Sequence, residues 1–173
     1  MNETIKNILE RRSIRKYQER SVEESLLNEV VKAGTYAPSG MNKQSAIILV
    51  VTKKETRDKL SNLNAKIMGT DTDPFYGAPA VIIVLADKQS PTHIYDGSLV
   101  MENMMIAAHS LGLGTCWIHR AKEMFESEEG KEILKEAGIT GEYEGIANCI
   151  IGYPAESGTL HERKENYIYK IME

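Results

Sequence analysis

The chain has 173 residues, of which 42% are hydrophobic and 27% charged, and its net charge is -4. This length favours a single domain over residues 1–173, and the acidic balance argues against general nucleic-acid binding, which usually needs a basic face. The longest apolar runs are far shorter than the roughly 20 residues of a membrane-spanning helix, and the N-terminus lacks the apolar core of a secretion signal. We therefore expect a cytoplasmic protein with no membrane or nucleic-acid partner.

The cysteines and histidines do not form a recognisable site. Cys116 and Cys149 lie in apolar surroundings without the spacing of a disulfide framework or a CxxC metal motif, so we expect buried, reduced thiols. The histidines are scattered along the chain without a metal-ligand spacing. The sequence therefore predicts no metal site.

Two helices are expected at the start of the chain. Apolar side chains on one side of residues 3–12 predict a short helix. Ser21 and Glu24 have the spacing of a capping box, in which a serine caps the helix and a glutamate follows three residues later. They predict a second helix that begins at Ser21 and ends at about Gly34.

The middle of the chain predicts two strands separated by a helix and a loop. The apolar, largely β-branched run at 46–52 predicts a strand in the centre of a sheet, and residues 80–87 predict a second central strand. Residues 54–66 look helical. Glycine, proline and small polar residues mark loops at 37–42 and 69–79.

A long apolar-periodic segment leads the second half of the chain. Residues 94–111 carry apolar side chains on most sides, which predicts a helix in the core. Strands are expected at 114–119 and 144–153. Between them, residues 121–137 predict a helix that is interrupted near Gly130.

These elements do not alternate with the strict βαβ rhythm of a doubly wound fold. They favour an α+β fold, in which helices flank a small, mostly antiparallel sheet. The tail at 165–173 places Tyr167, Tyr169 and Ile171 at alternate positions, which suits an extended arm.

A cluster of positive charge lies close to the N-terminus, where Arg11, Arg12, Ser13 and Arg15 fall within five positions. The planar fork of arginine grips phosphate oxygens with two hydrogen bonds, and a serine hydroxyl adds a compact donor. This combination suits a phosphate monoester, such as the end of a mononucleotide. The alternative is a basic helix end that complements the helix dipole, and for this segment alone that explanation is favoured.

A second candidate is the loop at 37–44, in which Asn42 and Gln44 project amide groups that can bond the edge of a heterocycle. The alternative is an ordinary connection between a helix and a strand.

Two further candidates lie in the second half of the chain. The glycines within 111–118 let the backbone approach a flat ligand, although Gly112 or Gly114 also suits the end of a helix. Arg163 and Lys164 can complete a phosphate site, or they belong to a solvated, charged tail.

The order of these motifs along the chain resembles the nitroreductase family of FMN-dependent enzymes. The likeness runs from Arg11 to about Lys164 and rests on "RRSIRKY", "APSGMNKQ", "NMMIAAHSLGLGTCWI", "IIGYP" and a late "RK". The resemblance implies an α+β homodimer with two FMN sites at the subunit interface. It also implies that the C-terminal segment wraps onto the partner subunit as an exchanged arm.

The resemblance also implies roles for individual residues. Arg11 and Ser13 would hold the FMN phosphate, joined by Arg163 or Lys164, and Arg12 would add a backbone or side-chain contact. Arg15 would reach the N1/O2 side of the ring, where a cation favours the reduced form. The remaining implied contacts are Pro38, Ser39, Gly40 and Asn42 from the other subunit, Gln44 nearby, and Gly114 and Thr115 beside the ring near N5.

The implied function is transfer of hydride from NADH or NADPH, through flavin N5, to an organic acceptor such as a nitro compound or a quinone. Such a reaction follows ping-pong kinetics, and positioning and electrostatics carry it, so no side chain is assigned as a catalytic acid or base. The alternatives are a flavin-binding carrier or sensor without turnover, and a specialised flavin enzyme on the same fold.

The chain departs from the family's usual pattern after the second motif. Ser45 and Ala46 stand where proline and an aromatic residue are common, so we expect a more open wall beside the ring. Phe75, Tyr76 and Trp117 are candidates for lining a substrate pocket, but core packing explains each of them equally well.

Overall fold

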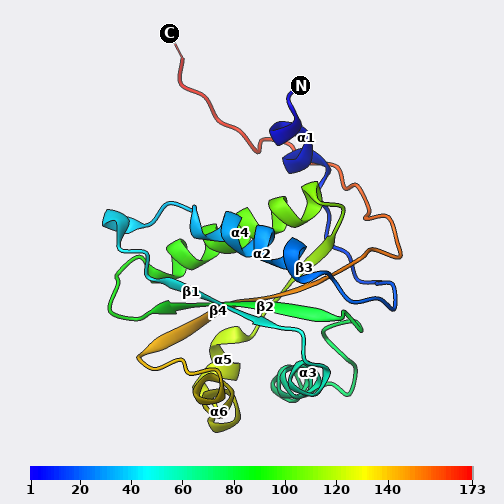
Figure 1. Cartoon of the computed structure of the whole chain (residues 1–173). Coiled ribbons are helices and arrows are strands. Elements are labelled where there is room, and N and C mark those ends of the chain that lie inside the picture. The colour runs from blue at the N-terminus through cyan, green and yellow to red at the C-terminus, as the bar shows by residue number, and fades with distance from the viewer. Residues whose placement is uncertain (173) are drawn as a thin grey trace.

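A computed structural model describes residues 1–172 of the chain, and its centre is a four-stranded sheet. All neighbouring strands are antiparallel, in the order β1-β2-β4-β3 (Figure 1). This arrangement confirms the α+β expectation. The strands are β1 (Ala46–Val51), β2 (Ala80–Asp87), β3 (Gly114–Ile118) and β4 (Tyr143–Gly152).

The central position expected for β1 is wrong, because this strand lies at an edge and pairs with β2 alone. Its run of apolar residues has another cause. Ala46 and Ile48 pack against the core on one face of the sheet, whereas Ile47 and Leu49 pack against the core on the other. A strand that helices cover on both faces looks central in sequence even when one of its edges is free.

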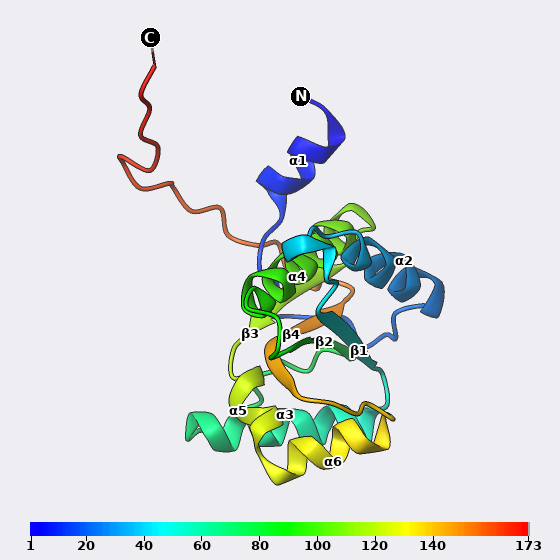
Figure 2. The ribbon, with the colours of Figure 1, turned by 90° about the vertical axis from the view of Figure 1, so that its left-hand side faces the viewer.

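Helices cover both faces of the sheet in separate layers (Figure 1). One layer contains α2 (Glu24–Thr35) and α4 (His93–Ser110), and the other contains α3 (Lys54–Met68), α5 (Ala121–Glu126) and α6 (Glu128–Glu136). Each layer closes its own apolar core against the sheet. The first helix, α1 (Glu3–Glu10), has no buried residue and projects from the body (Figure 2).

Two details of the helices correct the sequence predictions. Helix α2 is capped by Glu23 rather than Ser21, so the capping-box prediction is wrong. The Glu23 carboxylate accepts hydrogen bonds from the nearby Arg20 and from Tyr153, which follows β4, and the contact with Tyr153 ties the start of the helix to the end of the sheet.

The second correction concerns the interrupted helix at 121–137. The break lies at Ser127 rather than near Gly130, because the Ser127 hydroxyl caps α6 by accepting from the Gly130 amide at 3.1 Å. Gly130 allows the two helices to meet closely, since a β-carbon there would lie 2.0 Å from the Met124 carbonyl oxygen.

Cys116 and Cys149 are buried free thiols, as the sequence predicts. They lie in different cores, and burial raises the pKa of the Cys149 thiol. Within residues 1–172, no helix combines the length and apolarity that a membrane crossing requires. In the same range, no cluster of histidine, cysteine and acidic side chains could hold a metal ion.

The two ends of the chain leave the body near one another (Figures 1 and 2). After β4, residues 155–172 form neither helix nor strand, and Tyr167, Tyr169 and Ile171 are exposed. The segment has the extended shape that its sequence predicts. That it wraps onto a partner subunit stays a prediction.

Candidate functional site

The basic segment that follows α1 lies between β3 and the beginning of the tail. The Ile14 amide donates to the Thr115 carbonyl at 2.9 Å, and Ser13 forms a parallel bridge with Thr115. On the other side, the Ala155 amide donates to the Lys16 carbonyl at 2.9 Å. The fold therefore brings the first and third sequence motifs together with the chain that leads into the tail.

A pocket of about 450 Å³ opens beside this segment and gathers positive charge. Arg163 lines it, whereas Lys164 does not and instead places its ammonium 5.5 Å from the Tyr167 ring. Of the two tail cations, Arg163 alone lies at this pocket. The pocket is lined by Arg11, Arg12, Ser13, Arg15, Glu156, Ser157, Gly158, Thr159, His161 and Arg163.

Arg11 and Arg12 are adjacent in sequence but make different contacts. Arg12 Nη1 donates to the carbonyls of Leu9 at 2.7 Å and Arg11 at 2.6 Å, so it caps the end of α1. Arg11 Nη1 is buried and has no hydrogen-bond partner within the described chain. The Arg12 side chain therefore fits the helix-end explanation. Arg11 is the C-cap residue of α1, but its side chain points to Glu102 of α4 instead of to the helix end.

The environment of Arg11 favours an anionic ligand. The carboxylate that pairs with it belongs to Glu102 of α4, at a long 3.8 Å from Nε. A buried N–H group without a partner costs free energy, and more so when it belongs to a charged group. A phosphate oxygen at this nitrogen would remove that cost, so the residues present fit a phosphate-bearing cofactor.

Arg15 is exposed, and its guanidinium lies 5.9 Å from the centre of the Tyr76 ring. Its backbone amide donates to Glu156 Oε1 at 2.7 Å, which fixes the main chain at this point. Tyr76 is 45% exposed and remains available to a ligand, whereas Phe75 is fully buried and belongs to the core. Trp117 is partly buried against the other core.

Gly114 and Thr115 begin β3 and form the wall behind the basic segment. A β-carbon on Gly114 would lie 2.9 Å from the Ile14 side chain, so glycine lets the two segments approach. Thr115 Oγ1 is buried and lacks a hydrogen-bond partner among the described residues. Both line a neighbouring pocket of about 360 Å³ that also includes Arg11. The helix-ending role falls to Gly112, which follows α4 with a φ of 77°.

The second motif lies elsewhere, beyond the opposite end of α4 (Figure 1). Residues 40–42 form a short 3₁₀ turn that ends at the exposed Asn42, and the exposed Gln44 lies two residues further on. The pocket beside this loop, about 420 Å³ in volume, shares no residue with the arginine pocket. One chain therefore does not bring Pro38, Ser39, Gly40, Asn42 and Gln44 to Arg11, and their contribution to a second subunit's site stays a prediction.

Sequence reasoning missed Asp96, which lies buried in the first turn of α4 beneath this loop. Its carboxylate accepts hydrogen bonds from the Gly40 amide and from the hydroxyls of Ser45 and Thr92. Burial raises the pKa of Asp96, but these hydrogen bonds lower it by more, so the carboxyl titrates below its usual range. An acid in the first turn of a helix that is largely buried was the available signal.

Sequence reasoning also missed three residues of the segment that follows β4. Glu156 and His161 line the arginine pocket, and Gly158 packs so tightly that a β-carbon there would lie 2.1 Å from Arg12 Cβ. No local motif marks these residues. Their role follows from the course of the tail past the basic segment.

The sequence profile described as "Nitroreductase family" matches residues 8–72 and 70–153 of this chain. A protein of Archaeoglobus fulgidus whose name includes NAD(P)H nitroreductase is 30% identical over 173 aligned positions, which cover 96% of this chain and 94% of that protein. An FMN reductase [NAD(P)H] of Bacillus subtilis is 29% identical, over 94% of this chain and 70% of its own length.

A solved structure is similar over nearly the whole fold. The nitroreductase with bound FMN from Bacteroides fragilis superimposes with a TM-score of 0.89 at 26% identity, covering 99% of this chain and 100% of that one.

Proposed function

This chain belongs to the nitroreductase family, and from that premise we propose that it is an FMN-dependent oxidoreductase. It would take hydride from NADH or NADPH and pass it to an organic acceptor such as a nitro compound or a quinone. The observation that carries the proposal is the buried, unpaired Nη1 of Arg11 in a pocket rich in arginine. Similar structures that contain FMN support the same identity for the ligand.

The residues of the pocket divide the work of binding. Arg11, Ser13 and Arg163 hold the phosphate, because Arg11 has a free donor and Arg163 reaches the pocket from the tail. Arg12 shapes the backbone by capping α1. Gly114 and Thr115 form the wall near the reacting edge of the ring.

Arg15 supplies an electrostatic contribution to the reaction. When bound, FMN supplies the redox chemistry by accepting and donating hydride at N5. Arg15 would place a positive charge near the part of a bound ring that becomes negative on reduction, and Glu156 fixes the backbone from which Arg15 projects. Tyr76 lies beside Arg15 and helps to bound the space for the acceptor.

We infer that two chains form a homodimer with the flavin at the interface, since the second motif lies away from the arginine pocket. Apolar side chains are exposed on α1 at Ile5 and Leu9 and on α4 at Ile94 and Leu99. A subunit interface would remove these side chains from water, which favours association. The dimer places Pro38, Ser39, Gly40, Asn42 and Gln44 of one subunit at the site of the other.

The C-terminal arm belongs to the same proposal. Tyr167, Ile168 and Tyr169 are exposed, and β1 has one edge unpaired within the described residues. Exchange of arms between subunits would bury these side chains. Since both helical layers pack on one sheet, we also treat residues 1–173 as a single domain.

The test is flavin binding followed by turnover. Purified protein titrated with FMN is expected to bind one flavin per chain, and NADH or NADPH is expected to bleach it under anaerobic conditions. Mixing with nitroaromatics and quinones should then restore the oxidised spectrum. Protein that binds no FMN would disprove the proposal, and stoichiometric flavin that neither nicotinamide reduces would favour a carrier or sensor.

The double substitution Arg11→Ala with Ser13→Ala tests whether FMN binds in the arginine pocket. It is expected to weaken FMN binding while the far-UV circular dichroism stays unchanged. Unaltered affinity in this variant would place the flavin elsewhere on the molecule.

A further inference from the structure

The Asp96 carboxylate joins the two ends of the loop that carries the second motif. It accepts from the Gly40 amide at 3.0 Å, where the loop begins its 3₁₀ turn, and from the Ser45 hydroxyl at 2.8 Å, just before β1. Asp96 is only 3% exposed, and a further hydrogen bond from Thr92 Oγ1 at 3.0 Å holds it in place. The residues between these two anchor points are therefore closed into a short loop.

The closed loop has a backbone conformation that its residues rarely adopt. Met41 and Asn42 both have a φ of 52°, and Gln44 has a φ of 48°. Side chains with a β-carbon disfavour this left-handed region, although asparagine tolerates it better than most. Three such residues within four positions need an external restraint, and the Asp96 hydrogen bonds span them on both sides.

Packing does not supply that restraint. Met41, Asn42 and Gln44 are exposed, and the pocket of about 420 Å³ lies beside the loop. Apolar side chains such as Val31, Ile48 and Val100 line the pocket, so the loop has room to move when its hydrogen bonds are lost. Within the loop, the Gln44 amide also donates to Ser39 Oγ at 3.0 Å. Asp96 supplies the hydrogen bonds that tie the loop to α4, and hydrogen bonds to a buried charge are stronger than those between neutral groups.

We propose that Asp96 is a positioning residue for the flavin site of the partner subunit. By holding the loop from Gly40 to Ser45, it presents Asn42 and Gln44 in the conformation that the partner's site requires. This inference rests on the proposed function, because it assumes that the loop completes an FMN site across the dimer interface. It adds that a charge buried in α4, without contact to the cofactor, sets the affinity of that site.

The first experiment substitutes the carboxylate and its donors one at a time. Asp96→Asn keeps the shape of the side chain but removes the charge, and its amide group cannot accept at every position that the carboxylate serves. We expect FMN to bind about tenfold more weakly to this variant, by fluorescence titration. Ser45→Ala and Thr92→Val each remove one donor and are expected to weaken FMN binding by smaller factors in the same direction.

A control variant separates positioning from loss of stability. Leu63→Ala removes buried packing in α3, on the far face of the sheet from Asp96. It is expected to lower the urea midpoint and leave the dissociation constant of FMN unchanged. Equal weakening of FMN binding in Asp96→Asn and Leu63→Ala, at equal loss of stability, would overturn the proposal.

A mixed dimer tests whether Asp96 acts on the partner's site. One chain carries Asp96→Asn, and the other carries Arg11→Ala with Ser13→Ala, each with a different affinity tag. If Asp96 acts through the loop on the partner, one site of the mixed dimer has both defects and the other has none. At an FMN concentration between the wild-type and variant dissociation constants, we expect one tightly bound flavin per mixed dimer.

Each result decides a separate question. A mixed dimer with no tight site would show that Asp96 acts within its own chain, and this would overturn the proposal. Wild-type protein that binds no FMN would instead disprove the proposed function. If Asp96→Asn does not fold, Thr92→Val takes its place in the mixed dimer, with the same expected stoichiometry and the same contrary result.

Discussion

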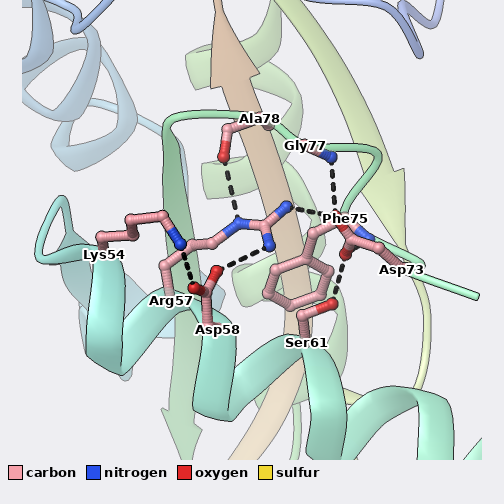
Figure 3. A network of polar contacts seen from close by, with 8 residues as sticks. All are labelled: Lys54, Arg57, Asp58, Ser61, Asp73, Phe75, Gly77 and Ala78. Carbon is pink, nitrogen blue, oxygen red and sulfur yellow. Dashed lines mark hydrogen bonds and ion pairs between the residues drawn. The ribbon is translucent and has the colours of Figure 1, made fainter.

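Two arginine sites in this molecule differ in how completely their donors are used. Arg57 of α3 is 7% exposed, and it donates to the Ala78 carbonyl at 3.1 Å, to Asp58 at 3.0 Å and to Asp73 at 2.7 Å (Figure 3). Arg11 has a buried Nη1 without a partner in the described chain and a carboxylate no closer than 3.8 Å. The first site is complete without a ligand, and the second is not.

The surroundings of Arg57 show what the complete site does. Asp73 accepts from the Ser61 hydroxyl and from the backbone amides of Phe75 at 2.8 Å and Gly77 at 2.7 Å (Figure 3). The Arg57 guanidinium also lies 5.6 Å from the Phe75 ring. The network fastens the loop before β2 to α3, so its role is structural. A saturated buried arginine stabilises the fold, whereas an unsaturated one at a pocket indicates a binding site.

Arg57→Ala should produce the largest change in stability. It leaves Asp73, whose side chain is 39% exposed, without its charged partner, and losing hydrogen bonds between charged groups costs about 1.5–3 kcal/mol. We expect a lower urea midpoint with an unchanged m-value, and FMN affinity close to wild type in the protein that stays folded. FMN affinity is measured in the absence of urea. A loss of affinity as large as that caused by Arg11→Ala would contradict the assignment of a purely structural role to Arg57.

Arg11→Ala should give the opposite pattern. Loss of a charge-assisted contact to phosphate is expected to weaken FMN binding by about tenfold to a hundredfold. Stability without FMN should change little, because Arg11 makes few contacts that its removal breaks. Arg12→Ala is the matched comparison: since Arg12 caps α1, it should weaken FMN binding less. Equal effects of the two substitutions on affinity would contradict this assignment.

Acid should weaken the complete site through Asp73. Burial raises the pKa of Asp73, but hydrogen bonds from Ser61, Arg57 and two amides lower it by more, so its net pKa is depressed. A depressed carboxyl contributes stability that is fully present above its unfolded pKa, near 3.9, and is lost as the pH falls through the folded value. The urea midpoint should therefore fall as the pH drops below about 4, and it should fall less steeply in Asp73→Asn. An identical slope in the variant would assign acid unfolding to other groups.

Glu156→Gln should give the smallest change, in the direction of tighter binding. Glu156 places a negative charge in the arginine pocket, where it opposes a bound phosphate. Glutamine still offers an oxygen to the Arg15 amide, so the backbone contact can persist. We expect a severalfold gain in FMN affinity by calorimetry, and the gain should shrink as salt is raised. Weaker binding would show that the charge itself holds Arg15 in place.

Several parts of this description could be predicted from local sequence. Helical periodicity placed α4 within one residue of each end. The spacing of Arg11, Ser13 and Arg15 offered an anion site only as a candidate, since a basic helix end was favoured for that segment alone, and the pocket now supports the anion site. The apolar pattern of residues 46–51 could not show that β1 lies at an edge of the sheet. A strand that helices cover on both faces is apolar throughout, whether it has one neighbouring strand or two. The open wall expected at Ser45 stays untested, but its hydroxyl is turned inward to Asp96.

The types of element, the α+β class and the chemistry available to a ligand follow from residues that are near one another along the chain. Periodicity, capping and clustered charge are local properties, so they can be seen without a structure. Which arginine lacks a partner depends on contacts between distant residues. Glu156 meets the Arg15 amide across 141 positions, and Asp96 meets Gly40 across 56. Those contacts exist because the sheet and α4 bring the segments together, and they separate a structural arginine from one that is free to bind.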